Sequence, residues 1–382
     1  MEKIKTKFIF VSGGVLSGIG KGLCAASIAM LLKNRGYKVG SLKCENYLNI
    51  DSGTINPIEH GDAFLCEDGL EADMDLGTYE RLLDQNMGKD NFTTIGQIYS
   101  KVINNERNMV YKGEDVEAIP HVTDEIIQRF INAGKGKDFC VIEFGGTVGE
   151  YQNVLYYEAA RILKIKHPNI VCHTHVSYMP VPQHLGEPKT KPIQNSVKQV
   201  LALGLSTDFL LVRSPVNIDK RRKNLLQTFT SVKDTRIISA PDLENIYKLP
   251  LIFKDQNFDK EILDFFNIKT KTKSNLSSWK KLIKNIEKSK TGKQVTIAIA
   301  GKYLSKNDGD IELQDSYHAL IESLKHASWV KNLKLNIKWV NTNYVKKDFD
   351  NQFKNVDGII VPIGWGKRGI EGKIKAIKYA RE

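Results

Sequence analysis

Residues 7–36 combine a compact apolar run, a glycine-rich turn and a helical pattern, an order that few folds accommodate. The run KFIFVS (7–12) ends in two glycines, which is typical of a buried parallel strand followed by a turn. Residues 21–35 place apolar side chains on one helical face, and Gly36 ends that pattern. A second apolar run follows at 37–43. The segment therefore predicts a βαβ unit with a phosphate-binding turn after its first strand.

The turn has the sequence SGGVLSGIGKG over residues 12–22. Its glycines allow a tight backbone whose amides, together with the start of the following helix, bind phosphate oxygens. Lys21 is expected to reach the β and γ phosphates of a nucleotide. The turn departs from the strict Walker pattern because no glycine stands five residues before Gly20, and because Gly22 replaces the usual Ser or Thr that binds Mg²⁺. A glycine-rich turn without a ligand is the alternative.

Residues 51–80 contain nine acidic residues and no Lys or Arg. Because Mg²⁺ takes oxygen ligands and no hydroxyl follows Lys21, carboxylates are expected to bind the metal. Ordinary surface solvation is the alternative for any single acid. One further carboxylate lies at the C-terminal end of the run FCVIEF, where open α/β sheets bind their ligands. The candidates are Glu67, Asp68, Asp73, Asp75 and Glu143.

Further apolar runs alternate with helical patterns along the first two thirds of the chain. This alternation predicts an α/β fold with a mostly parallel, P-loop-type sheet flanked by helices. The additional strands are expected at 139–144, 169–176, 208–213 and 236–240, and the helices at 154–164 and 195–203.

Residues 269–293 contain nine Lys and one Glu and are expected to form a solvated linker with a helix around 277–288. A new αβ pattern then begins, with strands expected at 295–301, 332–340 and 357–366 and a helix at 314–327. About ninety residues follow the linker, so the second domain is expected to be incomplete. The predicted organisation is residues 1–268, 269–293 and 294–382.

The formal charge of +12 and the pI near 9.2 suggest nucleic-acid binding at first sight. However, residues 1–250 carry about +1 and residues 251–382 about +11. A near-neutral domain with an acidic stretch suits a metal–nucleotide site better, so no nucleic-acid partner is expected. No apolar run approaches the roughly 18 residues of a membrane span, and the first residues lack a signal-peptide pattern. A cytoplasmic protein without a membrane partner is expected.

The five cysteines, Cys24, Cys44, Cys66, Cys140 and Cys172, show no CxxC spacing. They therefore favour neither a disulfide framework nor a zinc site. The string Cys172-His173-Thr174-His175 offers three metal-ligand types, but ligands on alternating faces of one strand rarely converge on a tetrahedral site.

Residues 186–196 (GEPKTKPIQNS) place two lysines next to the start of a predicted helix. Two ammonium groups beside a helix N-terminus favour a polyphosphate site, with an exposed basic turn as the alternative.

Taken together, these strings resemble the CTP synthase family over essentially the whole chain. They are GIGKG (18–22), DSGT (51–54), HG (60–61), EDG (67–69), DMDLGTYER (73–81), NFTT (91–94), IPH (119–121), EFGGTVG (143–149), KTKP (189–192), AGKY (300–303) and RGIEGK (368–373). A generic P-loop ATPase or partitioning protein lacks the KTKP and EFGGTVG strings.

The resemblance implies that MgATP phosphorylates the uracil O4 of UTP, that ammonia displaces this phosphate, and that a class I glutaminase domain supplies the ammonia. Lys21 and Lys43 would be catalytic, and Asp75 and Glu143 would bind Mg²⁺. The residues that would bind ATP are Gly18, Ile19, Gly20, Lys21, Gly22, Leu23, Asp75, Asp242 and Leu243. Those that would bind UTP, or CTP as feedback inhibitor, are Ser17, Glu150, Tyr151, Gln152, Lys189, Thr190, Lys191, Pro192, Ile193 and Gln194. The family assembles as a homotetramer.

The chain departs from the family pattern at Glu45-Asn46-Tyr47, at Glu117 and at Pro241, and the family's later nucleotide-binding Lys aligns with Leu225 unless Lys223 serves. The glutaminase segment keeps Gly364 as a remnant of the glutamine-binding turn but has Ile363 where the family has Gly. No cysteine follows Cys172, so no glutamine hydrolysis is expected. The expected function is CTP synthesis with free ammonia. The alternative is an inactive paralogue or fragment that only assembles with a full-length synthase.

Overall fold

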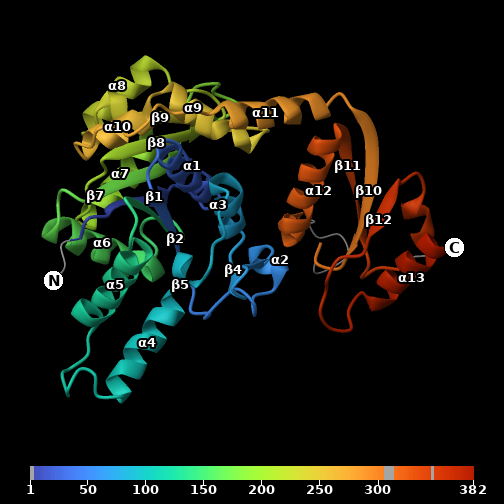
Figure 1. The fold of residues 1–382 in the computed structure, drawn as a ribbon, viewed down its shortest axis with the longest axis horizontal. Helices are drawn as coiled ribbons and strands as arrows, with labels where there is room; N and C mark the ends of the chain where they lie inside the picture. Colours follow the sequence, from blue (N-terminus) through green and yellow to red (C-terminus); the bar gives the residue numbers. More distant parts are fainter. Residues whose placement is uncertain (1–3, 305–313, 346–347) are drawn as a thin grey trace. The chain divides into compact units, whose positions relative to one another are not determined.

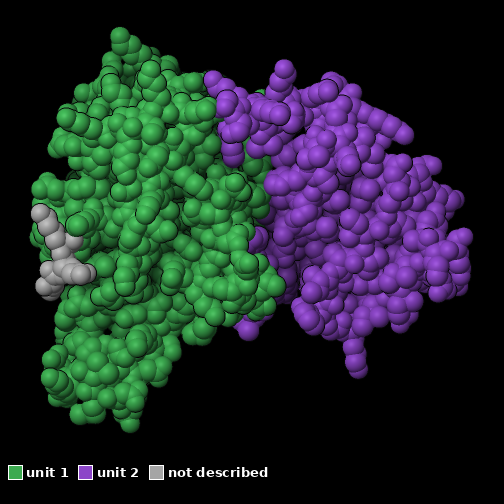
Figure 2. Space-filling model, in the orientation of Figure 1, with its two compact units in different colours: residues 1–51, 65–276 green, residues 52–64, 277–382 purple. Residues whose placement is uncertain are grey.

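A computed structural model describes residues 4–304, 314–345 and 348–382. The chain forms two compact units. The first comprises residues 1–51 and 65–276, and the second comprises residues 52–64 and 277–382; they are coloured separately in Figure 2. None of the helices within the described residues is both long and apolar enough to span a membrane. The sequence-based division at residues 268 and 293 stays a prediction.

A seven-stranded sheet is the centre of the first unit (Figure 1). Its strand order is β5-β2-β6-β1-β7-β8-β9, and every neighbouring pair is parallel. The predicted α/β class with a parallel sheet is therefore confirmed. The strands are β1 (Lys7–Gly14), β2 (Val39–Glu45), β5 (Phe92–Thr94), β6 (Phe139–Phe144), β7 (Val171–Tyr178), β8 (Phe209–Ser214) and β9 (Ile237–Pro241). Two short strands, β3 (Phe64–Leu65) and β4 (Glu71–Ala72), lie outside this sheet.

Helices cover both faces of the sheet. On one face, Phe10 contacts Phe130 of α5 with ring centroids 5.1 Å apart, and α4 to α8 lie on this side. On the other face, Phe209 contacts Phe258 of α10 at 5.4 Å, with α1, α3 and α9 on the same side. The helices are α1 (Lys21–Asn34), α3 (Asp75–Leu83), α4 (Ile95–Arg107), α5 (Thr123–Ala133), α6 (Val154–Lys166), α7 (Lys191–Ala202), α8 (Lys220–Thr230), α9 (Leu249–Asp255) and α10 (Phe258–Phe265).

Alternation of side chains along β1 separates two groups of polar residues. Ser12 shares its face with Phe8 and Phe10, so it faces α6 and α7. Val11 pairs in register with Glu143, and Glu143 pairs with Lys43, so these side chains lie on the α1 and α3 face. The sheet therefore places a carboxylate–lysine group on one face and a polar group around Ser12 on the other.

The second unit has a three-stranded parallel sheet in the order β11-β10-β12. The strands are β10 (Lys293–Gly301), β11 (Leu333–Asn341) and β12 (Gly358–Ile360), and the helices are α2 (Pro57–His60), α11 (Ser277–Ser289), α12 (His318–Lys331) and α13 (Ile370–Arg381). The expected strand at 357–366 ends at Ile360 because Pro362 lacks a backbone N–H for the ladder. The hydrophobic core of the second unit contains Ala298, Ala300, Val340, Phe349, Phe353 and Ala376.

Residues 52–64 belong to the second unit although they lie within the first in sequence. The Asp62 amide donates a hydrogen bond to the Asp315 carbonyl at 2.9 Å, and the Asp62 carboxylate accepts from the Ala319 amide at 3.3 Å. Burial raises the pKa of Asp62 to about 6. Part of the acidic stretch at 51–80 is thus structural, at the start of α12.

Candidate active site

The phosphate loop joins β1 to α1 through residues 15–20. Gly18 and Gly20 have φ angles of 70° and 81°, in the left-handed region that glycine enters without a steric penalty. Gly20 directly precedes α1, so the first amides of the helix are free of helical partners and available to an anion. Val15 also has a left-handed φ of 80°, a strained conformation for a β-branched residue and one that is frequent at functional sites.

Lys21 lies at the first position of α1 and is 8% exposed. Its aliphatic stem packs against Gly13, where an added Cβ would lie 2.5 Å from the Lys21 Cδ. Burial lowers the pKa of Lys21, and the charge of Glu143 opposes this effect. The Lys21 ammonium group beside the phosphate loop is therefore largely desolvated. A desolvated ammonium group binds a phosphate more strongly than a hydrated ammonium group does.

Gly22 has a steric role that its place in the motif alone does not reveal. A Cβ at this position would lie only 2.7 Å from the Asp75 Cγ. The absence of a side chain thus lets the Asp75 carboxylate approach the start of α1. The Asp75 carboxylate thus lies beside the helix position where the Walker pattern has its hydroxyl residue, and the expectation that a carboxylate replaces this hydroxyl stays a prediction.

Three elements bring a lysine and its carboxylates together beside this loop. The Lys43 Nζ on β2 lies 2.5 Å from Asp75 Oδ2 on α3, 2.9 Å from Glu143 Oε1 on β6 and 3.3 Å from Glu45 Oε1. The Tyr79 hydroxyl, one turn after Asp75, donates to Glu143 Oε2. Glu143 is 1% exposed and Lys43 is 4% exposed.

The electrostatics of this group act differently on Lys43 and on Glu143. Burial by itself would lower the pKa of Lys43, but attraction to Asp75, Glu143 and Glu45 outweighs burial, so this pKa is raised well above its ordinary value. Burial raises the pKa of Glu143, while Lys43 opposes the increase. Asp75 and Glu143 both approach one positive charge, and such a pair of oxygen donors suits a small divalent cation.

Of the residues expected to bind UTP, Lys189 to Gln194 lie at the start of α7. Thr190 and Gln194 are buried, and the Gln194 side-chain amide donates to the Thr190 hydroxyl at 3.1 Å. The Arg222 guanidinium of α8 donates to the Pro188 carbonyl at 3.0 Å. An open cavity of about 180 Å³ lies here, with more basic than acidic residues in its wall. It is lined by Glu187, Pro188, Lys189, Thr190, Lys191, Arg221, Arg222 and Leu225.

Arg213 links the phosphate loop with the segment expected to contact adenine. Its guanidinium donates to the carbonyls of Ala240 and Pro241 at 2.9 and 2.7 Å and to Asp242 Oδ1 at 2.8 Å. A Cβ on Gly20 would lie 3.9 Å from Arg213 Nε. Asp242 therefore lies near the phosphate loop through this arginine, although Pro241 stands where the family has Lys.

Comparisons with known proteins agree with this geometry. The family model for the CTP synthase N-terminus matches residues 7–268, and that for class-I glutamine amidotransferase matches residues 312–382. CTP synthases from Hydrogenobaculum sp. and Clostridium acetobutylicum are 43% and 42% identical to the chain, which covers 69% and 70% of their lengths. These alignments include 100% and 99% of the chain. The chain belongs to the CTP synthase family.

Members of the CTP synthase family are ATP-dependent ligases that make CTP from UTP. Among solved structures, a plasmid partition protein from Borrelia burgdorferi bound to AMPPNP is 15% identical. The match covers 67% of this chain and 99% of that one, with a TM-score of 0.32, which is too low to add to the family evidence.

In this chain, the segment expected to bind CTP is only partly preorganised. Glu150 accepts hydrogen bonds from the Thr147 amide and hydroxyl, both at 2.7 Å, and from the Asn46 side chain at 2.9 Å. Asn46, which lies at one of the departures from the family pattern, therefore has a hydrogen-bond partner in the local structure. Tyr151 is 96% exposed and Gln152 is also exposed. Ser17 lies in the phosphate loop, and the structure does not bring it to the α7 cavity.

The glutaminase-like turn at Gly364 is enclosed by two lysines. Lys373 Nζ donates to the Pro362 carbonyl at 2.7 Å, and Lys302 Nζ donates to the Trp365 and Gly366 carbonyls. Ile363 is 66% exposed and is not among the described residues with a left-handed φ. Its side chain is thus accommodated by pointing into solvent. All five cysteines of the chain are buried and lie in the first unit.

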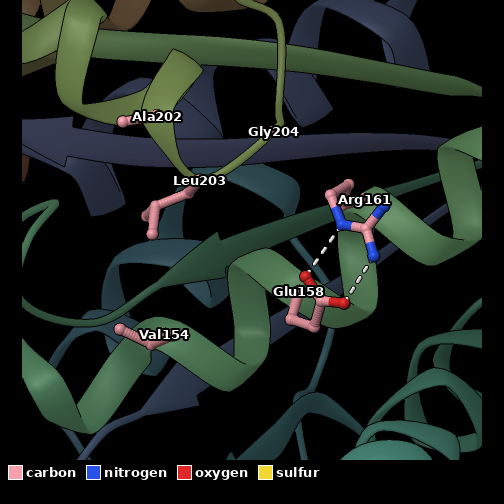
Figure 3. Close-up of a pocket in the computed structure, with 6 residues that line it drawn as sticks. All are labelled: Val154, Glu158, Arg161, Ala202, Leu203 and Gly204. Carbon is pink, nitrogen blue, oxygen red and sulfur yellow. Dashed lines mark hydrogen bonds and ion pairs between the residues drawn. The ribbon is translucent and has the colours of Figure 1, made fainter.

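A separate pocket of about 370 Å³ lies between α6 and the end of α7 (Figure 3). Its Arg161 donates to both carboxylate oxygens of Glu158, at 2.8 and 2.6 Å, as the dashed lines in Figure 3 show. This pairing raises the pKa of Arg161 and lowers that of Glu158. The ionic groups of the pocket therefore satisfy each other, and its lining includes none of the residues expected to bind nucleotide.

Sequence reasoning missed three sets of residues around the site. Arg213 lies at the end of β8, and its position after an apolar run at a strand end was an available signal. Arg221 and Arg222 lie in the basic run that follows the helix-capping Asp219. The bonds of Ser12 to His173 and His175 gave no local signal, because Ser12 is more than 160 residues away from both histidines.

Proposed function

We propose that this chain makes CTP from UTP, using MgATP and free ammonia. The observation that carries the proposal is the convergence of Lys43, Asp75 and Glu143 beside the phosphate loop, with Gly22 leaving space for Asp75. Phosphoryl transfer depends mainly on positioning and on stabilising charge, and this arrangement supplies both.

Asp75 and Glu143 would bind Mg²⁺, because their oxygens already approach a common positive charge. When bound, Mg²⁺ neutralises charge that develops on the transferring phosphate. Lys21 would bind the β and γ phosphates from the start of α1. Lys43, which pairs with the same two carboxylates, would contact the transferring phosphoryl group.

The reaction would proceed in two steps, phosphorylation of the uracil O4 and then displacement of this phosphate by ammonia. The uracil O4 attacks the γ phosphorus, so that an O4–P bond forms and the bond from this phosphorus to ADP breaks. Ammonia then forms a bond to C4, the C4–O4 bond breaks, and phosphate leaves with O4. The proton that uracil N3 loses in the first step and the proton that ammonia loses in the second pass to solvent. The basic cavity at the start of α7 would bind the UTP triphosphate, with Lys189, Lys191, Arg221 and Arg222 supplying positive charge.

Two parts of the proposal concern regulation and assembly. Residues 150–152 would bind CTP as feedback inhibitor, which the fixed Glu150 and the exposed Tyr151 support. The homotetramer remains a prediction from the family. We further propose that residues 1–382 alone do not hydrolyse glutamine, because the glutaminase-like unit contains no thiol to form the acyl intermediate.

Incubation with UTP, MgATP and ammonium, followed by chromatography, tests the function. The unaltered chain and the control Lys101→Met, which changes an exposed lysine, are expected to form CTP, whereas Lys43→Met is not. Glutamine in place of ammonium should give no CTP. Failure of the unaltered chain to form CTP with ammonium would refute the proposal and would support the alternative, an inactive chain that only assembles with a full-length synthase.

A further inference from the structure

Four buried side chains form one continuous hydrogen-bonded chain on the α7 face of the sheet. Ser196 Oγ lies 2.5 Å from His175 Nε2, and His175 Nδ1 lies 2.8 Å from Ser12 Oγ. Ser12 Oγ also lies 2.8 Å from His173 Nε2, and His173 Nδ1 lies 3.3 Å from the Ser206 carbonyl oxygen. Each of the four side chains belongs to a residue that is at most 2% exposed.

One arrangement of protons satisfies this whole chain. The Ser206 carbonyl can only accept, so His173 Nδ1 carries the proton and His173 Nε2 accepts from the Ser12 hydroxyl. Ser12 Oγ then accepts from His175 Nδ1–H, and His175 Nε2 accepts from the Ser196 hydroxyl. Both rings are neutral, because burial lowers the pKa of His173 well below its ordinary value and that of His175 to about 3.

This series of hydrogen bonds connects the end of β1 to α7, the helix whose start contains the basic residues expected to bind UTP. Ser12 and His175 are register partners in the β1–β7 pair, and Ser12 lies two residues before Gly14, where β1 ends. Ser196 lies in the second turn of α7, which packs against β7 and β1 (Figure 1). A Cβ on Gly14 would lie 2.9 Å from both Ser196 Cβ and His175 Nε2, so the helix and the strand are in close contact there.

We propose that His175 is a positioning residue that, through Ser196, fixes the start of α7 against the end of β1. This inference rests on the proposed function, because it takes the start of α7 as the UTP site and the loop after β1 as the ATP site. Apolar packing of Ile193 and Val197 holds α7 on the sheet, but such packing is not directional. A directional hydrogen bond defines the position of α7. Phosphoryl transfer from ATP to UTP requires such defined positions of the two bound nucleotides.

The two nucleotides should respond differently to loss of this contact. The phosphate loop is fixed by β1, whose main chain pairs with β6 and β7 on both sides. The start of α7 has no such ladder. Removing the Ser196–His175 bond is therefore expected to weaken UTP binding and to leave ATP binding nearly unchanged.

Isothermal titration of UTP, and separately of a non-hydrolysable ATP analogue with Mg²⁺, tests this inference. His175→Leu and Ser196→Ala are expected to weaken UTP binding at least tenfold and binding of the ATP analogue less than twofold. His175→Gln offers one N–H donor and one carbonyl acceptor, and it should bring UTP affinity to within about threefold of the unaltered chain. Thr174→Val is the control, since Thr174 is buried on the same strand and points to the opposite face.

If the variants weaken binding of UTP and of the ATP analogue equally, or if His175→Gln does not restore UTP affinity, the role is purely structural and the positioning role is overturned. UTP affinity that is unchanged in Ser196→Ala would also overturn it. Ser196→Ala removes a single hydroxyl, so it serves where His175→Leu does not fold. If the unaltered chain binds neither nucleotide, the proposed function fails together with this inference. If it binds both and the variants bind UTP normally, only this inference fails.

Discussion

Replacing Lys43 with Met removes the ammonium group that Asp75, Glu143 and Glu45 share at 2.5, 2.9 and 3.3 Å. The three carboxylates would then repel one another in a buried region. Removal of one partner from a buried ion pair costs about 3–5 kcal/mol. In a domain of this size, 1 kcal/mol corresponds to about 2–4 °C in Tm, so the variant is expected to unfold about 10 °C lower in EDTA.

Magnesium should reverse much of this loss. In the unaltered chain, Mg²⁺ would compete with Lys43 for Asp75 and Glu143, whereas in Lys43→Met the carboxylates would lack that partner. A ligand at 100 times its Kd adds about 2.7 kcal/mol of stability. Mg²⁺ is therefore expected to raise the Tm of the variant by several degrees more than that of the unaltered chain.

The assay is thermal unfolding followed by circular dichroism, in EDTA and in about 10 mM MgCl₂. This concentration corresponds to the large excess of ligand over its Kd that the estimate above uses. Lys101→Met is the matched control, since it removes an exposed lysine from the same unit. The reasoning is refuted if Lys43→Met unfolds at the same temperature as the control in EDTA. It is equally refuted if Mg²⁺ stabilises Lys43→Met no more than the unaltered chain.

Three further predictions follow from individual contacts. Gly22→Ala should displace the Asp75 carboxylate and lower kcat for CTP formation at least tenfold, and unchanged kcat would contradict the steric argument. Arg221→Gln should raise the KM for UTP about tenfold while the KM for ATP stays within twofold, and equal changes in both would contradict the assignment of the α7 cavity to UTP. The depressed pKa of His175, about 3, contributes stability that is present above pH 6.5 and is lost as pH falls towards 3. Between pH 7 and pH 5, His175→Gln should therefore lose about 2 kcal/mol less than the unaltered chain in urea unfolding, and parallel losses would show that His175 does not titrate as described.

Local patterns in the sequence predict most of the sheet and part of the site. The runs at 7–12, 139–144 and 208–213 are strands because buried parallel strands are continuously apolar. Asp75 could be named as a metal candidate because it lies in the acidic stretch at 51–80. Glu143 could be named because it lies at the end of a predicted strand. The structure adds the reason for Gly22, which is the proximity of Asp75, a residue more than fifty positions away.

Other features depend on contacts that no local pattern contains. The segment at 52–64 has the composition of a loop, and its placement with the second unit follows from partners at residues 315–319. Strand β5 has only three residues, too few for a period-two pattern to emerge. His173 and His175 were considered from the sequence only as metal ligands. In the structure both bond to Ser12, which brings them into a hydrogen-bonded chain instead.

Transfer of the O4 oxygen is the most direct test of the proposed chemistry. UTP labelled with ¹⁸O at position 4 would be incubated with MgATP, ammonium and the unaltered chain, and the released phosphate would be analysed by mass spectrometry. If O4 is phosphorylated at the site formed by Lys43, Asp75 and Glu143, one ¹⁸O appears in inorganic phosphate for each CTP formed, and Lys43→Met releases none. Phosphate that carries no label while CTP accumulates would contradict the account.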